Sequence, residues 1–353
     1  MPKSPLVRMF LVGAVASAIG IAIGLAIDWF PVEATEQASE VDFLYDVTLV
    51  IAVPIFVLVM TVAIYSVLRF RVSDDDESDG APIHGNSRLE VIWVAVPTII
   101  VVALAAYAWI GLLALEEEGQ NPLRVKVIGQ QFAWKYEYPA EAGMPAKQTT
   151  DLVLPVNRPV QFELNTEDVI HSFWVPAFRL KQDIVPGITT AMRLTPNRLG
   201  AFPVVCAELC GIGHSTMRQT VRVVDATRYT SWRGEPPSPA LSAGAPGTDS
   251  ADGKRLFEGT GCAGCHSLSA AGEAAATGPP LGGLDAIAAA RAPGVSVEQY
   301  IRESIVDPTK VVAPGYSPEG MPQNYREQLS PRELEALVSY LSAVSKESGG
   351  KPQ

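Results

Sequence analysis

Three long segments without a charged residue occupy the first third of the chain. They cover residues 9–27, 47–68 and 91–115. At about 1.5 Å of rise per residue, each is long enough to cross a hydrocarbon core of about 30 Å as a helix. We therefore expect a membrane-anchored protein, with three buried helices of a large soluble core as the alternative.

The charges around these segments predict their orientation. Lys3 and Arg8 precede the first segment, and Arg69, Arg71 and Arg88 lie between the second and the third, whereas residues 28–42 contain neither Lys nor Arg. Because positively charged loops stay in the cytoplasm, the N-terminus and the loop at 69–88 are predicted to be cytoplasmic. Everything after residue 115 is then outside.

The first apolar segment has a second interpretation as a secretory signal peptide. Val32 and Ala34 are placed as a small-residue cleavage site. The 19 uncharged residues of this segment exceed the usual apolar region of about 7–15 residues, which favours a retained membrane span. Both interpretations leave the C-terminal part outside.

Short β-prone runs follow the acidic residues 116–118. They are separated by Pro, Gly and Asn, and they include residues 124–128, 150–154, 189–194 and 220–224. Short strands with frequent turns predict an all-β sandwich or barrel of about 110 residues.

A stretch rich in Pro, Ala, Ser and Gly at residues 234–252 reads as a flexible linker to a mostly helical last domain. Ser330, Pro331 and Glu333 form a helix N-cap, a first-turn proline and a capping-box acid. Apolar residues on one helical face follow them: Leu334, Leu337, Val338 and Leu341. Shorter helices are predicted at 255–258 and 297–306.

The sequence thus predicts five parts of the chain. They are residues 1–41 (first span or signal peptide), 42–118 (two-helix membrane hairpin), 119–233 (sandwich), 234–252 (linker) and 253–353 (helical domain).

The formal charge of −11 argues against nucleic-acid binding, which requires a basic face, and favours cationic protein partners.

The four cysteines form two close pairs, Cys206 with Cys210 and Cys262 with Cys265. Both pairs are predicted to lie outside the cytoplasm.

The first cysteine pair belongs to a cluster of soft metal ligands. Cys206, Cys210, His214 and Met217 fall within twelve residues, and His171 lies 35 residues before Cys206. Thiolate and thioether sulfur together with imidazole select copper, and an axial Met is typical of electron-transfer copper sites. A disulfide between the two cysteines would need neither His nor Met, and a structural Cys2His2 zinc site would leave Met217 without a role.

This cluster resembles the dinuclear copper (CuA) signature of cytochrome c oxidase subunit II, C-x-E-x-C-x3-H-x2-M with a distant H-S. The resemblance covers about residues 42–229 and implies a cupredoxin-like sandwich. It implies that Cys206 and Cys210 bridge two coppers, while His171 and His214 each bind one. Met217 would ligate one copper and the backbone carbonyl of Glu208 the other, with the Glu208 carboxylate binding magnesium at the interface with subunit I.

Two further segments extend the resemblance. In the aromatic run at residues 130–138 the family more often has a Trp where this chain has Phe132, and that Trp accepts electrons from a docked cytochrome c. Docking of a soluble cytochrome in the usual way is therefore in question. Residues 89–93 match the family's E-x-I-W segment, in which Glu90 would lie at the mouth of a proton pathway. An acid at a helix start is equally explained as a dipole-stabilising cap.

The second cysteine pair reads Cys262-Ala-Gly-Cys265-His266, the C-x-x-C-H pattern of covalent haem c attachment. Met321, 55 residues after His266, is the expected sixth ligand of the iron, because it is the one Met of the last domain. The segment resembles class I cytochrome c, in which a proline carbonyl orients the axial His. Residues 278–282 supply two candidates for that proline, Pro279 and Pro280.

These resemblances imply the subunit through which electrons enter a respiratory, proton-translocating cytochrome c oxidase. Electrons would pass from haem c to CuA and on to subunit I, which reduces oxygen to water. Implied partners are subunits I and III, the lipid bilayer, and an upstream cytochrome or quinol:cytochrome c reductase as donor. The chain would be a multi-pass protein of the bacterial plasma membrane with its copper and haem domains on the outer face. Alternatives are a CuA-containing nitric oxide reductase subunit, a copper chaperone and a free-standing electron carrier.

Overall fold

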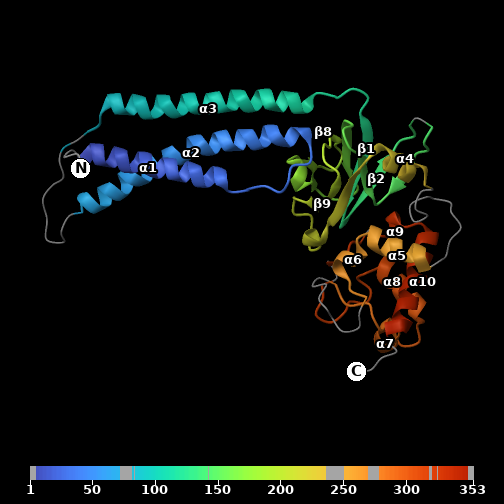
Figure 1. Ribbon diagram of the computed structural model, residues 1–353. Helices are drawn as coiled ribbons and strands as arrows, with labels where there is room; N and C mark the ends of the chain where they lie inside the picture. The colour runs from blue at the N-terminus through green and yellow to red at the C-terminus, as the bar shows by residue number, and fades with distance from the viewer. Residues whose placement is uncertain are drawn as a thin grey trace. The chain divides into compact units, whose positions relative to one another are not determined.

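Helices α1 Pro5–Ala26, α2 Glu36–Arg69 and α3 Ser87–Glu116 make up the first part of the computed structural model (Figure 1). The structure describes residues 5–71, 82, 84–141, 143–235, 250–268, 278–317, 320–323 and 325–348. It divides into two units, Met1–Glu117 and Glu118–Gln353. By length and composition, each of these helices is able to cross a membrane.

Helix α1 packs closely against α2. A β-carbon on Gly20 would come within 2.8 Å of the Val53 side chain, and one on Gly24 within 2.7 Å of Leu49. The absence of side chains at these two positions therefore allows the helices to approach each other, as in many membrane helix pairs. Most other large apolar side chains of this unit are exposed, as a surface that faces lipid requires. Lys3, used above for orientation, lies outside the described residues.

The second unit begins with a β-sandwich of two five-stranded sheets. One sheet has the order β3-β2-β1-β5-β8, with bounds Lys147–Thr149, Ala133–Tyr138, Leu123–Gln130, Val160–Thr166 and Thr190–Leu194. The other has the order β4-β10-β9-β6-β7, with bounds Leu152–Pro155, Arg218–Val224, Gly200–Cys206, His171–Trp174 and Lys181–Ile184.

Alternating side chains explain the core of the sandwich. In β1, Val125 and Val127 are fully buried while Arg124 faces solvent. Because successive side chains of a strand point to opposite faces, one face of the sheet supplies the core. Trp134 and Phe173, from opposite sheets, meet edge to face with ring centroids 5.4 Å apart. This pair fixes the packing of the sheets directly beside the start of β6.

Helix α4, Ala226–Gly234, closes the sandwich domain. Its Arg233 is completely buried and donates to the carbonyl of Pro139 at 2.7 Å. Lys147 donates to the carbonyl of Trp232 at 2.6 Å. Gly234 therefore belongs to this helix and not to the linker, whose residues 236–249 lie outside the described residues.

The remaining helices form the last domain. They are α5 Ser250–Gly259, α6 Cys262–Cys265, α7 Leu284–Arg291, α8 Val297–Val306, α9 Tyr325–Gln328 and α10 Pro331–Ser348. The capping box of α10 is confirmed, since Ser330 N donates to Glu333 Oε2 at 2.8 Å and Glu333 N donates to Ser330 Oγ at 3.3 Å. Helix α5 begins at Ser250, inside the segment expected to be linker. The expected order of apolar helices, β-sandwich and helical domain is confirmed.

Candidate functional site

Strand pairing brings the distant histidine to the cysteine pair. Strands β6 and β9 run antiparallel with Phe173 opposite Cys206. His171 begins β6 and Cys206 ends β9, so the 35 residues between them in sequence do not separate them in space. The chain then turns through the copper loop, residues 207–217, before β10 begins at Arg218.

Five side chains converge at the start of this loop. Sγ of Cys206 lies 3.9 Å from Sγ of Cys210 and 3.9 Å from Nδ1 of His171. Sγ of Cys210 lies 3.6 Å from Nδ1 of His214 and 3.9 Å from Sδ of Met217. The carbonyl oxygen of Glu208 lies 3.2 Å from Sγ of Cys206. Every ligand implied by the resemblance is therefore present at one place.

The geometry favours metal binding over the disulfide alternative. Both cysteines are free, and their sulfurs are nearly twice as far apart as the roughly 2.05 Å of a disulfide bond. His171, Cys206 and Cys210 are buried with ligand atoms within 4.8 Å of one another. Met217 is fully buried with its sulfur toward the cysteines, which a zinc site would not require. The donor set fits copper.

The two thiols are electrostatically coupled. The hydrogen bond between the two thiols is the largest influence that lowers the pKa of Cys206, helped by His171 against the opposing effect of burial. The same pairing raises the pKa of Cys210. Both sulfurs must be deprotonated to bind metal, so copper binding releases any proton that the pair holds.

Asp168 is a residue of this site that the sequence interpretation missed. Its Oδ1 lies 2.8 Å from Nε2 of His171, on the side of the ring opposite the cysteines. Burial acts to raise the pKa of Asp168, but hydrogen bonds from His171 and from the amides of Gln131 and Val169 lower it overall. The spacing D-x-x-H was the available signal, since an acid three residues before a ligand histidine is able to reach its far nitrogen.

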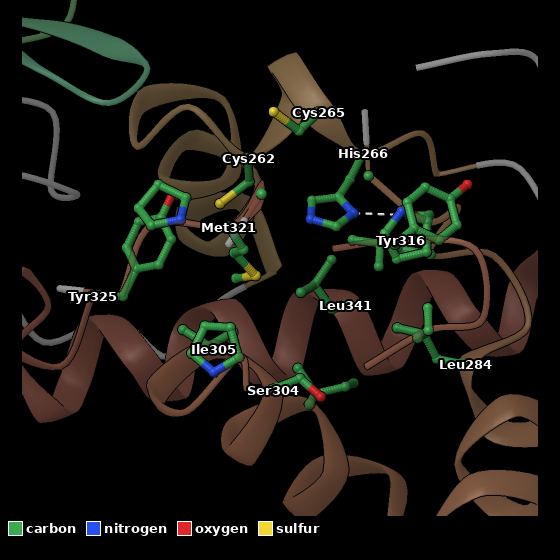
Figure 2. Close-up of a pocket in the computed structure, with 18 of the residues that line it drawn as sticks. Cys262, Cys265, His266, Leu284, Ser304, Ile305, Tyr316, Met321, Tyr325 and Leu341 are labelled. Atoms are coloured by element: carbon green, nitrogen blue, oxygen red, sulfur yellow. Dashed lines mark hydrogen bonds between the residues drawn. The ribbon is translucent and has the colours of Figure 1, made fainter. Parts of the chain in front are cut away.

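A second site lies in the helical domain, where an apolar pocket receives the C-x-x-C-H residues (Figure 2). Cys262, Cys265, His266 and Met321 all line it. The rest of the wall is mainly apolar and comes from several helices, with Leu284, Ile301, Ile305, Leu337 and Leu341 among its residues. A large apolar cavity with two thiols and one imidazole in its wall fits a covalently attached haem.

The orientation of the axial histidine is explained by one backbone contact. Nδ1 of His266 donates to the carbonyl of Pro279 at 2.7 Å, which identifies Pro279 and not Pro280 as the orienting residue. Nε2 is thereby left for the iron. Burial lowers the pKa of His266 by more than this hydrogen bond raises it, which favours the neutral imidazole that binds metal.

The haem-attachment segment contacts the copper domain. A β-carbon on Gly261 would lie 2.8 Å from the backbone nitrogen of Phe132, and one on Gly264 would lie 2.6 Å from Oγ1 of Thr216. Phe132 lines the haem pocket and also packs against Gly211 and Gly213 of the copper loop. This one residue therefore touches both candidate sites, with its ring on the copper loop and its backbone at the haem-attachment turn.

Comparisons with known proteins agree with this geometry. Residues 21–110 match the transmembrane domain of cytochrome c oxidase subunit II, residues 146–224 its periplasmic domain, and residues 250–345 cytochrome c. Cytochrome c oxidase subunit 2 of Synechocystis sp. is 34% identical over 63% of this chain and 80% of its own length. That of Alkalihalophilus pseudofirmus is 32% identical over 87% of this chain and 89% of its own length, a share too large to leave out the whole haem domain.

The chain belongs to the cytochrome c oxidase subunit 2 family. It is a subunit of a haem-copper cytochrome c oxidase, serves electron transfer, and carries a fused cytochrome c domain. It has a CuA-type site that includes His171, Cys206, Cys210 and Met217. It is a membrane protein with a periplasmic oxidase domain.

Two other expected site residues of this oxidase subunit, Glu90 and Glu208, are not among the side chains that converge at the copper loop. Glu90 Oε1 accepts from the backbone amide of Asn86 at 3.1 Å, while the Asn86 side chain accepts from the amides of Arg88 and Leu89. Glu90 thus completes the N-terminal cap of α3, which is the alternative given for it above. The Glu208 side chain is exposed beside the copper ligands.

Proposed function

We propose that electrons enter this oxidase through the tethered haem c, pass to the dinuclear copper centre, and continue to subunit I, where oxygen is reduced to water. When bound, the dinuclear copper supplies a one-electron carrier whose charge is shared between two metals. The protein contributes the ligands Cys206, Cys210, His171, His214 and Met217 and the Glu208 carbonyl. For haem c it contributes Cys262, Cys265, His266 and Met321.

The position of Phe132 is the observation that supports electron transfer from haem c to copper in this order. Its ring packs on the copper loop, and its backbone receives the haem-attachment turn at Gly261. A soluble donor protein that used this surface of the copper domain would have to displace the tethered domain. Tethering also replaces a bimolecular encounter by an effective concentration of about millimolar. Both effects favour the tethered haem as the first acceptor.

We further propose the partners and location that accompany this role. Subunits I and III would bind the membrane helices, and a cytochrome or a quinol:cytochrome c reductase would donate electrons. The copper and haem domains would lie on the outer face of a bacterial plasma membrane. The match of residues 146–224 to a periplasmic domain supports that side.

Glu208 and Glu90 are proposed to act at the contacts with subunit I. The exposed carboxylate of Glu208, whose own carbonyl faces Cys206, is free of the copper site and available to a magnesium ion. Glu208→Gln should then retain copper, because the carbonyl is unchanged, and lose a bound manganese probe detected by EPR.

For Glu90, the capping contact does not prevent a second role in proton uptake. Glu90→Gln tests that role, and we expect slower turnover with unchanged assembly.

The order of electron transfer is tested by rapid mixing of the oxidised complex with soluble reduced cytochrome c. Absorbance would follow haem c and the copper centre separately. We expect haem c to be reduced first and copper to follow at the rate at which haem c is reoxidised. Reduction of copper ahead of haem c would overturn the proposed order.

A further inference from the structure

The loop between β5 and β6 places a carboxylate behind a copper ligand. Oδ1 of Asp168 lies 2.8 Å from Nε2 of His171, while Nδ1 of the same ring lies 3.9 Å from Sγ of Cys206. A neutral imidazole carries a single N–H. Its donation to the carboxylate selects the tautomer in which the lone pair of Nδ1 faces the copper site.

The rest of the surroundings leaves the His171 ring little freedom. His171 is fully buried, and the side chain of Asp168 is only 9% exposed. Trp134 meets the imidazole edge to face with centroids 6.1 Å apart. A β-carbon on Gly129 would lie 3.1 Å from Cδ2 of the ring, so the ring also packs against the backbone of β1. Cys206 faces Nδ1 of the ring, and on the Nε2 side Asp168 supplies the charge and the hydrogen bond.

The Asp168 carboxylate also accepts hydrogen bonds from the segments that surround the copper site. Its Oδ2 accepts from the amide of Gln131 at 2.7 Å, and its Oδ1 accepts from the amide of Val169 at 2.6 Å. The Gln131 side chain in turn donates to the carbonyl of Cys210 at 2.6 Å. Asp168 and Gln131 thus connect the β5–β6 loop, the β1–β2 turn and the copper loop in one hydrogen-bonded chain.

Among the described residues, the other histidine has no such support. Nδ1 of His214 faces Cys210 at 3.6 Å. In the part of the chain that the structure describes, Nε2 of His214 has no hydrogen-bond partner, and the residue is only half-buried. The two imidazoles that face the cysteine pair are therefore unequal within this subunit.

We propose that Asp168 is a positioning residue of the copper centre, which fixes the tautomer and orientation of His171 and adds to the difference between the two copper ions. The inference rests on the proposed function only in requiring that copper occupies the site. A carboxylate hydrogen bond strengthens the imidazole as a donor, and the negative charge stabilises the more positive, oxidised form of the centre. Loss of that charge should raise the reduction potential.

The test compares Asp168→Asn with Glu167→Gln in the assembled oxidase. Glu167→Gln removes the same charge one residue away, but its carboxylate is 43% exposed and pairs with Lys135 at 3.6 Å, not with His171. We measure copper content, the potential of the copper centre and the nitrogen couplings of its two histidines by pulsed EPR. Asp168→Asn should keep both coppers, raise the potential and change one histidine coupling only. Glu167→Gln should leave the couplings as in the wild type.

Two additional variants separate positioning from general damage. Asp168→Glu keeps the charge and should return the potential toward the wild-type value, whereas Asp168→Ala should weaken copper retention by about 10–100-fold. If the wild-type complex lacks a dinuclear copper signal, the proposed function fails. If that signal is present and Asp168→Asn matches Glu167→Gln in potential and couplings, the inference about Asp168 alone is overturned.

Discussion

Gly261, which directly precedes the first haem-attachment cysteine, lies against the backbone of Phe132 in the turn between β1 and β2. A β-carbon at position 261 would come within 2.8 Å of the Phe132 nitrogen, and the φ of +83° at Gly261 is itself one that residues with a side chain rarely adopt. The contact thus depends on glycine for two separate reasons, one steric and one conformational.

Gly261→Ala is expected to push the haem-attachment turn away from Phe132 and to slow electron transfer from haem c to copper. Gly294→Ala is the matched control, because Gly294 has a φ of +86° but no atom within 4 Å of its added β-carbon. Rapid mixing with reduced cytochrome c measures both variants, with haem content as a check. Equal transfer rates would show that this contact does not serve electron transfer.

Met321→Ala should retain haem bound through Cys262 and Cys265 but lose the low-spin His/Met spectrum and lower the haem potential, since Met ligation raises it. Met192→Leu, in β8 of the sandwich, is the control and should leave the haem spectrum unchanged. A persistent sulfur-to-iron absorption band in Met321→Ala would assign the sixth ligand to a different residue.

Cys210→Ser should abolish the mixed-valence signal in which one unpaired electron is shared between two coppers. A serine oxygen is a poor substitute for a bridging thiolate. EPR and metal analysis of the assembled oxidase measure the loss, while the haem c spectrum reports whether the neighbouring domain is intact. A wild-type site that returns zinc, or a single copper, would contradict the dinuclear assignment.

Termination of the chain after Glu235 should abolish most turnover with the physiological donor and leave the copper signal intact. The cut is placed there because Arg233 is buried and Lys147 donates to the carbonyls of Trp232 and Glu235, so an earlier end would damage the sandwich. Oxygen uptake by membranes measures turnover. A truncated oxidase that oxidised soluble cytochrome c as fast as the intact one would exclude the tethered haem as the obligatory first acceptor.

Ser330→Ala should destabilise the haem domain by about 1 kcal/mol, the usual cost of losing an N-cap. Ser339→Ala, at an exposed position inside α10, is the control and should be neutral or slightly stabilising, because Ala has the higher helix propensity. Thermal unfolding followed at the haem c absorption compares the two. Equal midpoints would mean that the capping box contributes nothing to this domain.

Local sequence signals predicted the structure well where the interaction is itself local. The capping box of Ser330 and Glu333 lies within four residues, and the predicted helix at 297–306 coincides with α8. The expected copper ligands were likewise recognisable because four of them fall within twelve residues. The linker was less well predicted, since α5 begins at Ser250 by packing against α10, which is distant in sequence.

Contacts between distant segments were harder to predict from the sequence. The D-x-x-H spacing is a signal for the contact of Asp168 with His171, but the contact of Asp168 with the amide of Gln131 depends on how the β5–β6 loop folds against the β1–β2 turn. The choice between Pro279 and Pro280 depends on the path of one backbone turn, and composition carries no signal for it. The contact of Phe132 with Gly261 is of the same kind, because it joins two separate domains.

The packing of α5 against α10 makes the haem pocket depend on the last helix of the chain. Leu337 and Leu341 of α10 line the haem pocket, yet the chain emerges with Cys262 and Cys265 long before these residues. Until α10 arrives, the two thiols belong to an open segment that haem is able to reach from several directions. If haem is attached before α10 folds against α5, it meets two accessible thiols, and the last helix then closes the pocket around the bound porphyrin.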